Sequence, residues 1–95
     1  MDAREFMQGH ADGAVAGKIP EILKDLTPEA MTQLGPLMAG APQPAVSNKV
    51  EPAGQDGADF YFDVTYFGGD GKSISMRETV RQIDGVWKIA ALVKP

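Results

Sequence analysis

The fold is decided by residues 58–93, which read ADFYFDVTYFGGDGKSISMRETVRQIDGVWKIAALV. This stretch predicts three antiparallel strands joined by two tight turns, because apolar and β-branched residues alternate with polar ones between two glycine-containing breaks. The second break, Asp84-Gly85, is a strong hairpin signal, since a type I′ turn needs a positive φ at both central positions. Most of the chain upstream is expected to form helical cover for one face of this sheet.

A two-residue turn at Asp84-Gly85 sets the register of the last two strands. It pairs Val80 with Ile89, Glu78 with Ala91 and Met76 with Val93. Side chains alternate between the faces of a strand. The face expected to be buried carries Met76, Glu78, Val80, Trp87, Ile89, Ala91 and Val93, and the outer face carries Arg77, Thr79, Arg81, Lys88, Ala90 and Leu92.

The first turn lies in the glycine-rich run of residues 68–71, GGDG. A two-residue loop at Asp70-Gly71 would place Phe62 and Val64 on the same face as Arg77, so a longer loop centred near Asp70 is expected. The resulting register pairs Tyr66 with Ile74, Val64 with Met76, Phe62 with Glu78 and Phe60 with Val80, and on the outer face Asp63 with Arg77 and Asp59 with Arg81. Apolar and opposite-charge pairs thus agree on one register.

Size and charge restrict the classes of function. The chain has 95 residues, no cysteine and a formal net charge of −4. This length predicts one domain, residues 1–95. The acidic balance argues against a nucleic-acid partner or an anionic membrane surface, because neither would find a basic patch. No apolar run approaches membrane length, and Asp2, Arg4 and Glu5 interrupt any signal-like segment. A cytoplasmic location is predicted, with a removed export signal as the alternative.

The N-terminal half carries helix signals. Asp2 followed by Glu5 is a capping-box pattern, which predicts a helix over residues 3–16. Residues 18–20 break and restart the helical pattern, and Thr27-Pro28 is a typical start for a third helix. Pro36 is expected to kink or end that helix, since it lacks an amide donor.

The sequence therefore predicts an α+β fold. Two to three N-terminal helices, within residues 1–40, pack on a curved four-stranded antiparallel sheet formed by residues 45–95. The first strand, residues 46–52, is expected at an edge, because its proline excludes a central position.

Two stretches resemble a known superfamily. Residues 26–31, LTPEAM, resemble a helix start of several small NTF2-like (cystatin-like) domains, and residues 84–89, DGVWKI, resemble their final hairpin. The resemblance implies a cone-shaped sheet that wraps a helix, frequently with a pocket at its open end and often with a homodimer. It implies no reaction, because this fold hosts isomerases, dehydratases and many non-enzymes.

Two titratable residues are the candidates for chemistry. Glu78 is placed on the core face, where desolvation would raise the pKa of its carboxyl group; the alternative is that it reaches water or a buried partner. His10, the one histidine, lies on the same arc of the first helix as Phe6 and Ala14 and could approach Glu78 or Tyr66. A histidine–carboxylate pair can shuttle a proton near neutral pH; the alternative is a structural histidine bonded to a backbone carbonyl.

Other site features are few. Phe62 and Tyr66 are further candidates to contact a ligand; the alternative for Tyr66 is that it caps the core with its hydroxyl in water. Gly71-Lys72-Ser73 is not a phosphate loop, because Tyr66 stands where the motif needs glycine and a strand follows. Too few histidines and no cysteine argue against a zinc site. We expect no metal and no cofactor.

The leading interpretation is a non-catalytic module that binds a small apolar ligand or a protein partner. One alternative is a small acid–base enzyme of isomerase or dehydratase type, which would use His10 and Glu78 on a hydrophobic substrate. Another is a homodimerisation domain that pairs through its outer sheet face, where Tyr61, Thr79, Ala90 and Leu92 are predicted to accompany the ion pairs.

Overall fold

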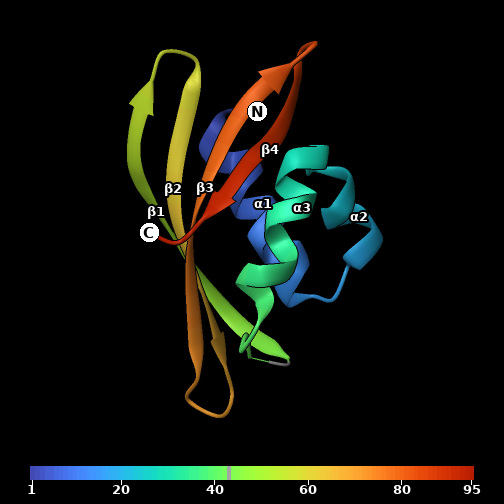
Figure 1. Ribbon diagram of the computed structural model, residues 1–95, viewed down its shortest axis with the longest axis vertical. Coiled ribbons are helices and arrows are strands. Elements are labelled where there is room, and N and C mark those ends of the chain that lie inside the picture. The colour runs from blue at the N-terminus through green and yellow to red at the C-terminus, as the bar shows by residue number, and fades with distance from the viewer. Residues whose placement is uncertain (43) are drawn as a thin grey trace.

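The computed structural model describes residues 1–42 and 44–95. Its elements are α1 (Ala3–Val15), α2 (Ile19–Lys24), α3 (Pro28–Met38), β1 (Ala45–Asp56), β2 (Asp59–Gly68), β3 (Ser73–Ile83) and β4 (Val86–Val93). The strands form one antiparallel sheet in the order β1-β2-β3-β4, and the helices lie on one of its faces (Figure 1). The predicted α+β fold is confirmed.

The helix starts follow the predicted capping chemistry. The Asp2 carboxylate accepts a hydrogen bond from the Glu5 amide at 2.8 Å, and the Asp2 amide donates to the Glu5 carboxylate at 3.2 Å. The Thr27 hydroxyl accepts from the Ala30 amide at 3.2 Å at the start of α3. Of the two outcomes expected at Pro36, a kink or an end, the helix does not end there: α3 continues for two residues beyond the proline, to Met38.

The β2–β3 hairpin has the predicted register. Val64 stands opposite Met76 and Phe62 opposite Glu78. On the outer face, two nitrogens of Arg77 donate to the two carboxylate oxygens of Asp63 at 2.8 and 3.0 Å. Arg81 makes the same two-pronged contact with Asp59 at 2.9 and 2.8 Å.

The β3–β4 hairpin follows the prediction only near its turn. Asp84 and Gly85 have φ values of 53° and 77°, as a type I′ turn requires, and Val80 pairs with Ile89. A bulge at Ala90 then shifts the register by one residue.

Beyond the bulge, the predicted pairing was wrong. Glu78 stands opposite Leu92 instead of Ala91, and Arg77 rather than Met76 stands opposite Val93. Because a one-residue slip turns every later side chain to the other face, Leu92 is buried with 2% exposure and Val93 is 46% exposed.

The bulge lies where the α2–α3 connection meets β4. The Ile89 amide donates to the Asp25 carbonyl at 2.7 Å, and the Thr27 amide donates to the Ile89 carbonyl at 3.0 Å. The Thr27 hydroxyl also donates to the Ala90 carbonyl at 3.4 Å. The segment from Asp25 to Thr27 thus occupies the outer edge of β4 and satisfies the backbone groups around the extra residue.

The first strand is at the edge of the sheet, as predicted, but it is longer than expected. It spans Ala45–Asp56 and includes Pro52, which stands opposite Phe62. Its pairing with β2 is irregular between Ala45 and Ser47 and again between Pro52 and Gly54. The proline is tolerated because an edge strand has one side without a partner strand.

The helices divide the covered face between them (Figure 1). The first helix, α1, packs mainly on β1, and α3 packs on β4, while α2 contacts α1. The two central strands, β2 and β3, have fewer contacts with the helices, and these come mainly from α1. No helix in the described part of the chain is long and apolar enough to cross a membrane.

Candidate functional site

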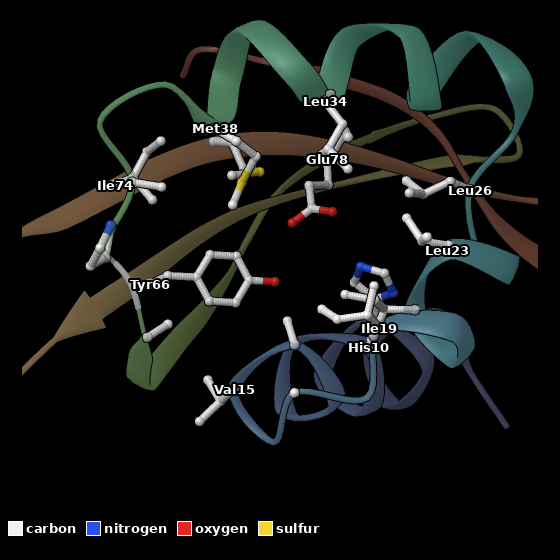
Figure 2. Close-up of a pocket in the computed structure, with 18 of the residues that line it drawn as sticks. His10, Val15, Ile19, Leu23, Leu26, Leu34, Met38, Tyr66, Ile74 and Glu78 are labelled. Carbon is white, nitrogen blue, oxygen red and sulfur yellow. The ribbon is translucent and has the colours of Figure 1, made fainter.

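A cavity of about 300 Å³ lies between the three helices and the inner face of the sheet (Figure 2). Such a volume is at the small end of the range of about 300–1,000 Å³ for small-molecule sites. Most of its wall is apolar. The wall includes His10 and Ala14 from α1, Leu34 from α3, Tyr66 from β2, Glu78 from β3 and Leu92 from β4.

Three polar side chains reach this cavity. Figure 2 shows the Glu78 carboxyl group, the Tyr66 hydroxyl and the His10 ring directed into the same space, from three different elements. The structure therefore brings together three of the four residues that the sequence singled out. The fourth, Phe62, is buried in the hydrophobic core and is not part of the cavity wall.

Glu78 is the most buried of the three, with 1% exposure. Its Oε2 atom has no hydrogen-bond partner among the described residues. Desolvation disfavours the charged form of a carboxyl group, and burial raises the pKa of Glu78 to about 8. The predicted position of Glu78 on the buried face is confirmed, and its burial favours the neutral carboxyl group at pH 7.

His10 is held by a different carboxylate from the one predicted. Its Nδ1 lies 2.8 Å from Oδ2 of Asp25, just after α2, and not in a hydrogen bond with Glu78. Burial lowers the pKa of His10, while the hydrogen bond and the charge of Asp25 act in the opposite direction. The ring is therefore neutral at pH 7, and the carboxylate acceptor places its proton on Nδ1. Its Nε2 is then an acceptor.

Two local features place Asp25 beside His10. The backbone of Asp25 is fixed to β4 through the Ile89 amide. The helices α1 and α2 also approach closely: a Cβ at Gly13 would lie 3.1 Å from Cγ2 of Ile22. A side chain at Gly13 would therefore require Ile22 of α2 to shift by a few tenths of an ångström.

Tyr66 is the third polar residue on the cavity wall. It is buried, and its hydroxyl points into the cavity and not to solvent (Figure 2). Burial raises the pKa of Tyr66, with smaller contributions from the charges of Glu78 and Asp12. The neutral hydroxyl can both donate and accept a hydrogen bond.

Sequence reasoning missed two residues of this site. Asp25 sits at a helix end, where a polar residue is ordinary, and its contact with His10 depends on how α2 packs. The sequence prediction placed Leu92 on the outer face, because the alternation of residues in β4 does not indicate the bulge at Ala90. The only sequence signal near either was the Thr27-Pro28 helix start, which fixes the Asp25–Thr27 segment.

The described residues contain no cluster of three or more His, Cys, Asp or Glu side chains suited to a metal ion. Comparison with known proteins adds no assignment. No family model, no curated protein and no solved structure matches the chain.

Proposed function

We propose that this protein binds a small, mostly apolar ligand that carries one polar group, in the cavity between the three helices and the sheet. The observation that carries the proposal is the unpartnered Oε2 of buried Glu78 on the wall of that cavity. A buried polar atom without a partner costs about 1–3 kcal/mol. A ligand that supplies the partner recovers that free energy only when it is bound.

The rest of the wall suits such a ligand. Leu34, Leu92 and Met76 offer apolar contacts, and the polar groups of His10 and Tyr66 lie beside Glu78 instead of being scattered. Binding sites for small molecules have this composition: an apolar lining with a few convergent polar groups that fix orientation.

The test is an NMR titration with 1-octanol, which has an apolar chain and one hydroxyl. We expect saturable shifts of the cavity residues at about millimolar concentration, since a small ligand that gains about 0.5 kcal/mol per non-hydrogen atom reaches about 4 kcal/mol with nine such atoms. Ala14→Leu, which fills part of the cavity, should weaken binding at least tenfold. Ala16→Leu, an exposed position at the end of the same helix, is the matched control. Shifts outside the cavity, or equal binding by Ala14→Leu, would refute the proposal.

A second candidate function is acid–base catalysis on a hydrophobic substrate. The specific observation in its favour is that Asp25 orients His10, leaving Nε2 as a base, while Glu78 remains a neutral acid in the same cavity. A base and an acid with displaced pKa values in one site are a common arrangement for proton transfer.

Exchange of the α-protons of 2-octanone in D2O tests this second candidate. The wild type should accelerate exchange, His10→Ala should abolish the acceleration, and Glu78→Gln should reduce it while leaving ketone affinity unchanged. No acceleration in the wild type, with the ketone bound, leaves a binding protein without this proton-transfer chemistry.

Assembly and family form the remaining part of the proposal. The helices on one face of a four-stranded antiparallel sheet support membership of the NTF2-like superfamily, and a cytoplasmic homodimer is consistent with it. Because of the β4 bulge, the outer face carries Val93 instead of Leu92, beside Tyr61 and Thr79. Sedimentation of wild type and Thr79→Glu tests a dimer formed through this face, and a monomeric wild type refutes it.

A further inference from the structure

The charge of the cavity wall restricts the ligand further. Among the lining residues described by the structure there is no lysine and no arginine. The ionisable groups on the wall are His10, Tyr66 and Glu78. An anionic ligand would therefore lose its water without gaining a positive partner, which is costly in an apolar site.

The hydrogen-bonding groups of the cavity wall also favour a cationic ligand over an anionic one. His10 donates from Nδ1 to Asp25, so only the acceptor Nε2 remains for a ligand. Glu78 in its ionised form is also an acceptor, and its Oε2 has no partner in the described part of the chain. Tyr66 can accept as well as donate. With Glu78 ionised, the site thus offers mainly acceptors, and it suits a group with several donors.

We infer that the ligand is a lipophilic amine, bound as its ammonium form with the charge against Glu78 and the hydrocarbon part along the apolar wall. This inference rests on the proposed binding function and names the chemical class of the ligand. An ammonium group has up to three N–H donors and a full positive charge. Charge-assisted hydrogen bonds are about twice as strong as neutral ones.

Ammonium binding changes the ionisation of Glu78. Burial raises the pKa of Glu78 to about 8, so its carboxyl group holds a proton at pH 6 to 7 in the free protein. A cation beside it favours the ionised form. Binding therefore releases a proton, and amine affinity rises as the pH increases from 6 to 8.

Other groups near Glu78 do not reverse this increase of amine affinity with pH. His10 of α1 is held by Asp25, after α2, and Tyr66 is contributed by β2. The negative charge of Asp12, also on α1, acts on Tyr66. The wall residues from α3, β1 and β4 are apolar: Leu34, Met38, Ala45 and Leu92.

Calorimetry with three ligands of one chain length tests the inference: octylamine, 1-octanol and octanoate. At pH 8 we expect octylamine to bind at least tenfold more tightly than 1-octanol, and octanoate to bind most weakly. At pH 6, titrations in buffers of different ionisation enthalpy should show release of about one proton per bound octylamine. 1-Octanol should release none.

Two variants test whether the preference for octylamine over 1-octanol depends on the Glu78 carboxyl group. Glu78→Gln should reduce octylamine affinity to that of 1-octanol, abolish proton release and leave 1-octanol binding within about threefold. Tyr66→Phe, which keeps the carboxyl group, should retain the preference for the amine. If Glu78→Gln does not fold, by circular dichroism, proton release by the wild type still decides the question.

The outcomes separate this inference from the proposed function. Binding of 1-octanol in the cavity without a preference for octylamine, or tighter binding of octanoate, overturns the amine assignment alone. Equal binding of octylamine by Ala14→Leu places the amine outside the cavity and also overturns it. Failure of all three ligands to bind overturns both.

Discussion

Arg77 and Glu78 are consecutive residues of β3, yet they face opposite environments. Arg77 lies on the outer face, half exposed, and shares two hydrogen bonds with Asp63 on the neighbouring strand. Glu78 lies on the inner face under the helices, and its Oε2 has no partner among the described residues. The outer charge is supported by a cross-strand partner and by water, whereas the inner carboxyl group has neither.

The two faces of the sheet therefore differ in how they accommodate a charged side chain. On the outer face each arginine of the two ion pairs has a carboxylate partner, so substitutions there should have small effects on the free energy of unfolding. The inner face holds a destabilising group at a fixed position, which is a typical property of functional sites. The following predictions test this difference, in order of decreasing effect.

The largest effect is expected for a new charge on the inner face. Leu92→Glu would place a second carboxyl group opposite Glu78 and should cost more than about 4 kcal/mol of unfolding free energy, or prevent folding. The neighbouring Val93→Glu, on the outer face, should change stability by no more than about 0.5 kcal/mol. Urea denaturation measures both. Similar effects at the two positions would contradict the bulge.

The second prediction concerns pH. Since the folded pKa of Glu78 is about 8 and its ordinary value is 4.5, the folded state retains a proton that the unfolded chain releases. The stability of the wild type should therefore fall as the pH rises between these values, by up to about 1.4 kcal/mol per pH unit.

Glu78→Gln should remove this slope and be the more stable protein at pH 8. Denaturation between pH 7 and 8.5 is the best measurement, because His10, whose pKa is lowered from 6.5, costs stability only at lower pH. The exposed substitution Glu51→Gln is the control and should keep the wild-type slope. A slope that survives in Glu78→Gln must come from another group.

A third and smaller effect is expected at Asp25. Asp25→Asn removes the charge that raises the pKa of His10, so that pKa should fall further, and stability should drop by about 1 kcal/mol. NMR titration is unambiguous because the chain has one histidine. Asp12→Asn, on the exposed side of α1, should leave the His10 titration unchanged. An unchanged His10 pKa in Asp25→Asn would disprove the contact.

The smallest effect is expected for the outer ion pair. Asp63→Asn should destabilise the protein by no more than about 0.5 kcal/mol, which is less than the loss expected for Asp25→Asn, and this loss should disappear at high salt, because exposed pairs are screened. Thermal unfolding at low and high salt measures this. A loss as large as that for Asp25→Asn would mean that the outer face is covered in solution.

The regular parts of the fold were predictable from local chemistry. The β2–β3 register followed from the agreement of apolar and charged pairs, and the helix starts followed from capping at Asp2 and Thr27. The inner position of Glu78 followed from that register alone. These features depend on residues that are near in sequence or directly opposite in a hairpin.

The remaining features depend on contacts between distant segments. The β4 bulge is stabilised by the backbone of Asp25–Thr27, more than sixty residues earlier in the chain. The partner of His10 and the cavity itself result from how α1, α2 and α3 divide the sheet. A strand pattern read by itself contains no information about these contacts, and for this reason Leu92 was placed on the wrong face.

The docking of Asp25–Thr27 on β4 also limits how copies of the chain can join. A sheet that grows by adding strands from molecule to molecule needs an open edge on each side. Here the β4 edge already accepts the Asp25–Thr27 backbone, and the Leu92 amide donates to Gln33 at 2.7 Å. At the other side of the sheet, β1 has no further strand beside it among the described residues, and it contains Pro52, which has no amide donor. If two copies paired through β1, neither copy would retain a free edge for a third. Growth of a sheet by strand addition would therefore stop at two copies, and a fibre would not form in this way.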